Sequence, residues 1–173
     1  NFEKYVVDTA PTGHALRLIS SPKMLDEWIK VAAKMRWKYR YMITSFSGSY
    51  KMDEVDTLLL NLKKTVKRIE NLLRDKNRCE FIPVCIPEAM AIMETTRLLS
   101  DLDRTGIIPK QIIVNNVMVS DEGDFCKRRK AGQLPYLQQI NQIYSHINRI
   151  EVPMFAEEIK GMQTLEQLKR SLF

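Results

Sequence analysis

The sequence has few of the features that mark secreted, disulfide-bonded or membrane-spanning proteins. Its 173 residues include only three cysteines, Cys79, Cys85 and Cys126, and this odd number at irregular spacing argues against a disulfide framework. A reducing, cytoplasmic setting is therefore expected. No apolar run approaches the roughly 18 residues that a membrane-spanning helix needs, and no signal-peptide pattern is present. These absences favour an ordinary globular domain.

Positive charge is concentrated in one internal segment. The whole chain has a formal net charge of +6, and residues 23–78 hold 14 Lys and Arg against 7 Asp and Glu. Such an excess is typical either of a solvated helical face or of a surface for an anionic partner. A non-catalytic basic-surface binding module therefore stays open as one function. No nucleic-acid-binding motif accompanies the basic residues, so no nucleic-acid partner is expected.

Four short runs predict β-strands, at residues 4–8, 80–86, 111–117 and 148–152. Three of them are nearly continuous apolar runs rich in Val and Ile, which is typical of parallel strands covered on both faces. The last run is weaker and is typical of an edge strand. Helical periodicity follows each of the final three runs, and Pro87 suits the first turn of the first of these helices. Alternating strands and helices predict an α/β fold.

The apolar positions of these three helices recur at intervals of about 3.6 residues. They are Ala89, Ile92, Met93, Thr96, Leu99 and Leu102 in the first helix, Leu134, Leu137, Ile140, Ile143 and Tyr144 in the second, and Leu165, Leu168 and Leu172 in the third. We expect these side chains to pack against the sheet.

Residues 23–78 interrupt the alternation and predict a helical insertion. One helix has apolar positions at Leu25, Trp28, Ile29, Ala32, Met35, Tyr39, Met42 and Ile43, and a second has a 3-4-3-4 seam at Val55, Leu59, Leu62, Val66, Ile69 and Leu73. Methionine adapts to varied apolar partners, but methionine at helical spacing is also common in cores. Four methionines are therefore candidates for a core or for a binding surface: Met24, Met35, Met42 and Met52.

The stretch DTAPTGHALR, residues 8–17, has the layout of a nucleotide switch. An aspartate at the end of a strand can hold a water molecule on Mg²⁺, and a glycine a few residues later lets a backbone N–H approach a γ-phosphate. The pattern D-x-x-x-x-G is weak by itself, because any tight strand-to-helix turn can contain it. No glycine-rich phosphate loop occurs in these 173 residues, which include six glycines.

Four motifs in order make the interpretation more specific. VDTAPTGHALRL resembles the signature of the arsenite-pump ATPase family (ArsA) and of its relatives that target tail-anchored membrane proteins. FIPVCIPEAMAIMETTRLLSDL resembles a strand and helix of that family, and IIVNNV resembles its adenine-contacting strand end. YLQQINQIY followed by VPMFAEEIKGMQTL resembles its carboxyl-terminal stretch. Together these motifs cover nearly all of the chain outside the helical insertion.

The resemblance implies the carboxyl-terminal half of a P-loop NTPase, with a doubly wound parallel sheet and an α-helical insertion. It implies ATP and Mg²⁺ as cofactors. Asp8 would be the switch aspartate near Mg²⁺, with Thr9 beside it and Gly13 at the hinge nearest the γ-phosphate. Because the family's glycine-rich phosphate loop is absent here, we expect this chain alone neither to cradle phosphates nor to hydrolyse ATP.

The resemblance also implies a site for the adenine base. Asn115 would hydrogen-bond the base, because an amide offers both a donor and an acceptor. A backbone and apolar wall beside the same base would be formed by Pro153, Met154 and Phe155. Glu88 and Arg97 match family positions as well, and helix capping or ion pairing explains them at least equally well.

Two departures from the family concern cysteines. The targeting ATPases commonly carry a C-x-x-C pair that holds zinc between two subunits, whereas here Cys126 is followed at that spacing by Arg129. Two chains would offer two thiolates against the four ligands of a structural zinc site, so zinc is doubtful as a cofactor. The pump ATPases use cysteines near the insertion to sense arsenite, and the three cysteines here do not form an obvious soft-metal triad.

The leading hypothesis is part of an ATP-hydrolysing ArsA-family ATPase. Residues 1–22 and 79–173 would form the nucleotide-binding domain, and residues 23–78 would bind a hydrophobic membrane-protein segment in tail-anchored protein targeting. The full-length protein would be a homodimer, cytoplasmic and peripheral at the membrane. Two alternatives stay open: the energising subunit of an arsenite or antimonite efflux pump, with a membrane pump subunit as partner, and the basic-surface binding module.

Overall fold

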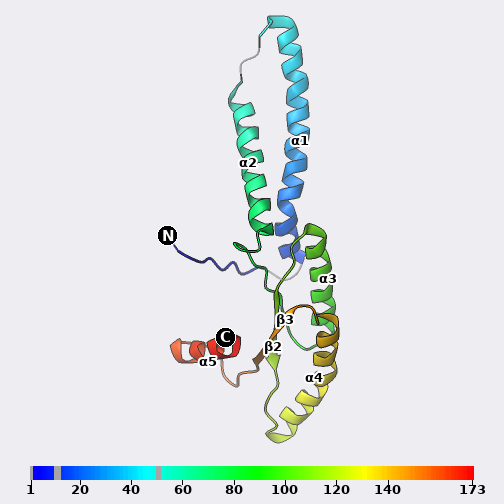
Figure 1. The fold of residues 1–173 in the computed structure, drawn as a ribbon, viewed down its shortest axis with the longest axis vertical. Helices are drawn as coiled ribbons and strands as arrows, with labels where there is room; N and C mark the ends of the chain where they lie inside the picture. Colours follow the sequence, from blue (N-terminus) through cyan, green and yellow to red (C-terminus); the bar gives the residue numbers. More distant parts are fainter. Residues whose placement is uncertain (1, 10–12, 50–51) are drawn as a thin grey trace. The chain divides into compact units, whose positions relative to one another are not determined.

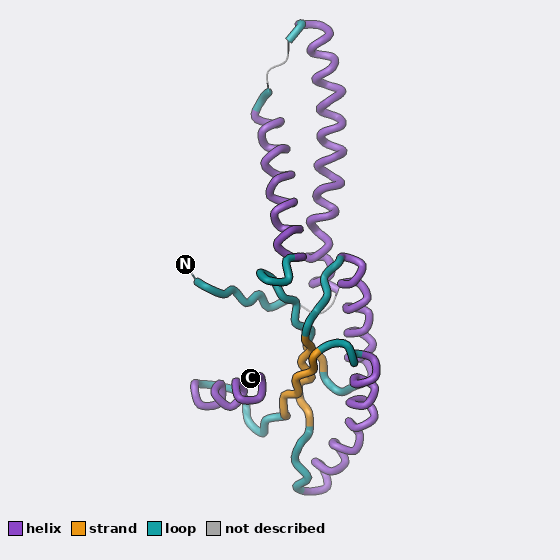
Figure 2. Tube along the Cα trace, in the orientation of Figure 1, coloured by secondary structure: helices purple, strands orange, loops and turns teal. Residues whose placement is uncertain are grey.

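The computed structural model describes residues 2–9, 13–49 and 52–173, which form five helices and three strands. The chain divides into two compact units, residues 1–79 and 80–173. In its described residues, the first unit contains helices and no strand, and the second unit is α/β (Figures 1 and 2). Among the described residues, no helix is both long enough and apolar enough to cross a membrane.

The first unit contains a helical hairpin, which consists of α1 (Gly13–Ser47) and α2 (Glu54–Arg74). α1 runs without interruption for 35 residues. It ends where Gly48 takes a φ of 71° and donates its N–H to the Thr44 carbonyl at 2.9 Å. Glycine favours this left-handed backbone, because it has no Cβ to clash with the carbonyl.

The start of α2 is fixed by a capping box and by an ion pair to α1. The Asp53 carboxylate accepts hydrogen bonds from the N–H groups of Val55 and Asp56, and the Asp56 carboxylate accepts one from the Asp53 N–H. Arg36 of α1 forms ion pairs with both carboxylates, and its Nε lies 3.2 Å from Asp56 Oδ1. These contacts place the first turn of α2 beside Arg36.

The apolar residues of the hairpin divide between a buried and an exposed face. In the predicted seam of α2, alternate members are buried or half-buried (Leu59, Val66 and Leu73), whereas the others are exposed (Val55, Leu62 and Ile69). α1 divides in the same way: Ile29, Ala32 and Ile43 are buried or half-buried, and Leu25, Trp28, Met35, Tyr39 and Met42 are exposed. Two helices share only one mutual face, so a second apolar stripe on each helix stays in solvent.

The second unit contains a three-stranded parallel sheet in the order β1 (Val84–Cys85), β2 (Gln111–Val117) and β3 (Asn148–Pro153). The parallel strands are connected by α3 (Ala89–Thr105) and α4 (Gly123–Ile143), and α5 (Met162–Leu172) follows β3. In Figure 1, α3 and α4 lie on one side of the sheet and α5 on the other. The predicted α/β fold with a parallel sheet is confirmed.

The core of this unit lies between the sheet and the α3–α4 layer. Its buried members are Cys85, Ile92, Ile112, Val114, Val117, Ile140, Tyr144 and Ile147. The Tyr144 hydroxyl is satisfied inside this core, since its oxygen lies 2.7 Å from Thr96 Oγ1 and 3.2 Å from the Ile92 carbonyl oxygen. Tyr144, which directly follows α4, is therefore held against α3 by burial of its ring and by the hydrogen bonds of its hydroxyl.

Several predicted element boundaries are wrong. Residues 4–8 were expected to form a strand, but the described segment 2–9 is irregular and exposed; among the described residues it has no ladder partner, and an apolar run forms a strand only by pairing. The predicted strand 80–86 pairs only at Val84–Cys85. Pro87 lies before the first turn of α3, because Glu88 is the N-cap residue.

Some predicted core positions are also wrong. Leu134 is exposed because it lies on the solvent side of α4, and Met93 is exposed on α3. No residue of α5 is fully buried, and Leu165 is exposed. Periodicity therefore identified the helices correctly and included residues outside the face that packs.

Replacement of Ile140 by alanine tests the core. Ile140 is fully buried, so the variant should lose about 2–5 kcal/mol of unfolding free energy through lost burial and a residual cavity. Ile143 lies one turn later on the same helix and is 37% exposed, so Ile143→Ala should lose less than about 1 kcal/mol. Urea unfolding of both variants measures the difference. Equal losses would contradict the assigned packing face of α4.

Candidate functional site

The candidate site lies at the carboxyl ends of β2 and β3. Asn115 is half-buried near the end of β2. The end of β3 is held beside it, because Val117 pairs with Pro153 and the Met154 N–H donates to the Val117 carbonyl at 2.9 Å. Pro153 and Phe155 are half-buried and Met154 is exposed. The structure thus brings Asn115 and the Pro153–Phe155 segment to one edge of the sheet.

The ladder between these strands is irregular at this point. Val114 pairs with Glu151 and Val117 pairs with Pro153, so Asn115 and Asn116 together lie opposite a single residue of β3. Asn116 has a φ of 59°, and among the described residues it is the one non-glycine residue with a positive φ. Such bulges redirect side chains at strand ends and are frequent next to functional sites.

Gln133 of α4 holds the irregular strand end in place. Its Nε2 donates to the Asn116 carbonyl at 2.9 Å, and its Oε1 accepts from the Met118 N–H at 2.8 Å. The side chain is 3% exposed, and both of its polar ends are bonded. Gln133 therefore fixes the backbone that carries Asn115, and it is a positioning residue for this edge.

Gln133 is not among the residues predicted from the sequence, although the sequence holds a signal for it. Gln133 precedes Leu137 by four residues and Ile140 by seven, so it lies on the buried face of α4. A polar side chain on such a face needs buried partners. The irregular end of the adjacent strand offers these partners, but its geometry is not visible in the sequence.

The predicted switch residues lie in the first unit. Asp8 and Thr9 are exposed in the irregular segment 2–9, and Gly13 is the first residue of α1. Residues 10–12, which complete the predicted loop, lie outside the described residues. The roles of these residues beside Mg²⁺ and phosphate stay predictions.

The position that would hold the second zinc cysteine has another partner. Arg129 Nη2 donates to Glu88 Oε1 at 2.8 Å, and this ion pair joins α4 to the N-cap residue of α3. Cys126 is half-buried one turn earlier on α4. The Glu88 side chain makes no capping hydrogen bond. Of the two structural roles considered for Glu88, ion pairing is therefore the one that the structure supports.

The three cysteines are free thiols in different surroundings. Cys79 and Cys126 are half-buried, whereas Cys85 is buried at the end of β1. Burial raises the pKa of the Cys85 thiol to about 11, and a hydrogen bond with Thr95 partly opposes this shift. Among the described residues, no group of three or more His, Cys, Asp and Glu side chains is arranged to hold a metal ion.

The four candidate methionines are all exposed. Met24, Met35 and Met42 lie on α1, and Met52 precedes the capping residue of α2. They belong to the surface of the helical hairpin rather than to its buried face. Their exposure argues against the core alternative, and their role as a binding surface stays a prediction.

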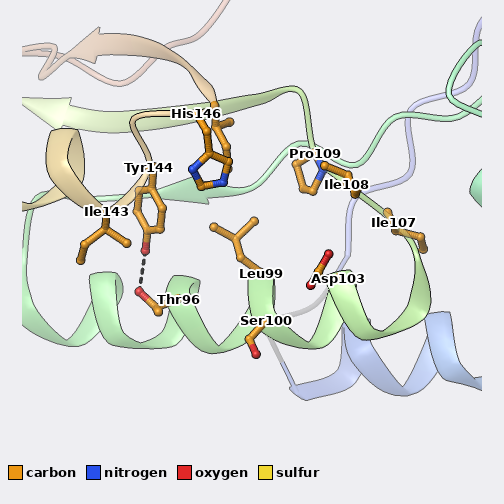
Figure 3. A pocket seen from close by; sticks show the side chains of 11 residues that line it. Thr96, Leu99, Ser100, Asp103, Ile107, Ile108, Pro109, Ile143, Tyr144 and His146 are labelled. Atoms are coloured by element: carbon orange, nitrogen blue, oxygen red, sulfur yellow. Dashed lines mark hydrogen bonds between the residues drawn. The ribbon is translucent and has the colours of Figure 1, made fainter.

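A shallow hollow of about 250 Å³ lies elsewhere on the second unit. Figure 3 shows Thr96 and Leu99 of α3 facing Tyr144 and His146, with Pro109 nearby. These last residues precede β2 and β3, so the hollow lies at the amino ends of the strands. It is therefore at the opposite end of the strands from Asn115 and the Pro153–Phe155 segment.

The parallel sheet and the helices that connect its strands define the class: an α/β protein, consistent with part of a P-loop NTPase-like fold. The family model for anion-transporting ATPases matches residues 1–173, and the chain belongs to this ArsA-type ATPase family. The resemblance that four motifs suggested is confirmed over the full length of the chain.

Three relatives illustrate the match. The ATPase GET3 of Chaetomium globosum is 29% identical over 182 aligned residues, which cover 99% of this chain and 54% of that protein. The ATPase ASNA1 homolog of Entamoeba histolytica is 32% identical over 176 residues, with 99% and 54% covered. The ATPase ASNA1 homolog 2 of Paramecium tetraurelia is 29% identical over 175 residues, with 96% and 54% covered. The chain spans about half the length of these curated relatives.

Replacement of Gln133 by alanine tests its positioning role. The variant leaves the Met118 N–H and the Asn116 carbonyl without their buried partner, which should cost about 1–3 kcal/mol of unfolding free energy. Gln138 is exposed on the same helix, and Gln138→Ala should change stability by less than about 0.5 kcal/mol. In the Gln133 variant, the amide NMR signals of residues 115–118 should shift most. Stability loss without those shifts would argue against a role at the strand end.

The buried Cys85 thiol should make stability fall at alkaline pH. Its pKa is raised in the folded state from an ordinary 9.0 to about 11, so the fold favours the protonated thiol. This contribution is complete below about pH 9 and is lost as the pH rises toward about 11. Urea unfolding across this range should show a smaller decline for Cys85→Ala than for the parent. In the folded parent, a thiol reagent should modify Cys79 and Cys126 before Cys85.

Proposed function

We propose that this chain is part of an ATP-hydrolysing ATPase whose helical hairpin binds a hydrophobic segment of a membrane protein, as in tail-anchored protein targeting. Family membership supports the ATPase part of this proposal. The exposed apolar face of the hairpin is the single observation that carries the client-binding part.

α1 carries an apolar stripe that its partner helix does not cover. Met24, Trp28, Val31, Met35 and Met42 are each exposed by 55–72%. Their spacing of four, three, four and seven residues places them on one side of the helix. The buried face of α1, marked by Ile29, lies on another side. A soluble helix rarely exposes such a row of large apolar side chains without a partner.

α2 carries a second stripe with the same kind of spacing. Its exposed members are Val55, Leu58, Leu62, Ile69 and Leu72. The positions of the charged residues show which sides of the two helices face the same way. Asp26 of α1 bonds to Lys30 at 2.6 Å, and its pKa is lowered first by that bond and further by the charges of Lys63 and Lys67 on α2. One side of the hairpin is thus shared by charged residues of both helices.

The two apolar stripes lie on the opposite side of the hairpin. On a view along either helix from its amino end, the buried face lies between the apolar stripe and the charged residues. The apolar stripe lies counterclockwise of the buried face and the charged residues lie clockwise of it, in both helices. The two helices run antiparallel and turn their buried faces toward each other. The two apolar stripes therefore lie on the same side of the hairpin, and the charged residues of both helices lie on the other side. The result is one continuous apolar face across two helices, which suits an apolar helix laid along it.

The nucleotide part of the proposal assigns the carboxyl edge of the sheet to ATP. Asn115 would hydrogen-bond adenine, and Pro153, Met154 and Phe155 would pack beside it; their arrangement at one strand edge supports this assignment. Asp8, with Thr9 and Gly13, would act near Mg²⁺ and the γ-phosphate. When bound, Mg²⁺ would neutralise charge on the phosphates.

The wider assembly follows the same hypothesis. The whole protein would be a cytoplasmic homodimer that meets the membrane only peripherally. Arg129 stands at the second cysteine position of the zinc motif and forms an ion pair with Glu88. We therefore propose a dimer that does not depend on a zinc clamp. One thiolate from each chain would leave such a site two ligands short.

Replacement of Met35 by glutamate tests the client-binding face. A buried methionine contributes about 1.5–3 kcal/mol of apolar transfer energy, so the variant should bind a hydrophobic helical peptide roughly tenfold or more weakly. Met93→Glu is the matched control, because Met93 is 67% exposed on α3 and Met35 is 69% exposed on α1. Affinity is measured by fluorescence anisotropy with a labelled transmembrane-type peptide. Equal weakening by both variants, or by neither, would contradict the proposal.

A further inference from the structure

The last part of α1 extends beyond its partner helix. Arg36 forms ion pairs with Asp53 and Asp56 at the start of α2, so residues 37–47 lie past the first turn of that helix. Eleven residues correspond to about three helical turns. Figures 1 and 2 show this extension at the end of the hairpin. We name residues 37–46 the α1 tip.

The α1 tip is unusually rich in exposed aromatic side chains. Trp37 is 66% exposed, Tyr41 68% and Phe46 92%, and Tyr39 and Met42 are also exposed. The rings of Trp37 and Tyr41 stack with centroids 6.3 Å apart and an interplanar angle of 29°. Large rings with a polar group at one end are favoured where one side of the ring is apolar and the other is wet.

The charge of the α1 tip has one sign. Residues 37–52 contain no Asp or Glu, whereas Lys38 and Arg40 alternate with the aromatic residues in the run WKYRY. The first acidic residue after the tip is Asp53, whose carboxylate pairs with Arg36. The tip therefore presents positive charge among aromatic rings, which complements an anionic and partly apolar surface.

Two hydroxyl groups of the α1 tip are hydrogen-bonded within the helix. The Thr44 hydroxyl donates to the Arg40 carbonyl and the Ser45 hydroxyl to the Tyr41 carbonyl, both at 2.9 Å. The Gly48 N–H closes the end of the helix on the Thr44 carbonyl at 2.9 Å. Hydroxyls bonded to their own helix can leave bulk water at little cost. This arrangement suits an interface with low water content.

We propose that the α1 tip docks on the surface of an anionic lipid bilayer, with its aromatic rings at the headgroup boundary. A single-stranded nucleic acid would also meet basic and aromatic groups, but it needs a charged groove, whereas Met42 and Phe46 extend the tip with wholly apolar surface. This contact is distinct from client binding, because Trp37, Lys38 and Tyr41 lie beyond Met35 at the end of the hairpin, although Met42 belongs to both surfaces.

The two tryptophans of the chain give a direct test. Trp28 lies on the apolar face and Trp37 in the α1 tip, with 72% and 66% exposure. The full chain with Trp28→Phe keeps Trp37 as its sole tryptophan, and we expect vesicles of phosphatidylcholine and phosphatidylserine to shift its emission to the blue. Brominated acyl chains should quench it. The matched variant, Trp37→Phe, keeps Trp28 and should show neither change.

A charge reversal tests the electrostatic part. Lys38→Glu should weaken binding to the anionic vesicles about fivefold or more, which corresponds to roughly 1 kcal/mol per basic side chain near such a surface. Lys64→Glu makes the same charge change on α2, away from the tip, and should leave binding within about twofold. Raised salt should weaken binding of the parent, and vesicles of phosphatidylcholine alone should bind it poorly.

Four outcomes would overturn the proposal: an unchanged Trp37 emission, an equal response from Trp28, equal binding to neutral vesicles, or tighter binding to a single-stranded oligonucleotide than to anionic vesicles. A Met24→Glu variant separates this proposal from client binding, because Met24 lies in the same apolar stripe but more than about three helical turns before Trp37, so its new charge is screened from the tip. It should bind the hydrophobic peptide more weakly, roughly tenfold or more, and keep its affinity for vesicles. Loss of vesicle binding in that variant would place the lipid contact on the apolar face and contradict a tip contact.

Discussion

Parallel pairing of β2 with a strand on each side is the constraint on which the second unit depends. Parallel strands have their carboxyl ends at the same edge of the sheet. The ends of β2 and β3 therefore bring Asn115 beside the Pro153–Phe155 segment, although Asn115 and Val152 are 37 positions apart in the sequence. The bulge at Asn115 and Asn116 then sets the local geometry of that edge. The bulge is stabilised by Gln133 of α4, whose side chain hydrogen-bonds the Asn116 carbonyl and the Met118 N–H.

The sequence allowed some of these features to be predicted and not others. β2, β3 and the existence of every helix were predicted correctly, because apolar periodicity over many residues is a strong signal. The run at residues 4–8 has an equally apolar pattern, and among the described residues it has no pairing partner. A helix satisfies its own backbone, whereas a strand depends on a neighbour that its own sequence does not specify. Asn115 was found through family motifs, but its support by Gln133 depends on long-range geometry.

The helical hairpin shows a related limit of periodicity. Apolar positions with 3-4 spacing correctly predicted both helices, but they did not distinguish Val66, which is buried, from Ile69, which is exposed. The two helices have more apolar residues than their shared interface can bury. The remaining apolar residues lie together on one side of the hairpin, and charged residues of both helices lie on the opposite side. In the proposed function, this uncovered apolar side is the surface that a hydrophobic partner would cover.

Continuity of α1 connects these surfaces. The helix begins at Gly13, carries the exposed methionines Met24, Met35 and Met42, and ends in the α1 tip at residues 37–46. Beyond Pro22 the helix continues to Ser47 without another proline or a glycine, so the apolar stripe and the tip lie on one continuous helical segment. Pro22 is buried within the first third of the helix, where it removes one backbone hydrogen bond and sets the place of easiest bending. If nucleotide moves the first turn of α1, as the proposed function implies, the proposed client and membrane surfaces would follow through this one helix, with any bending concentrated at Pro22.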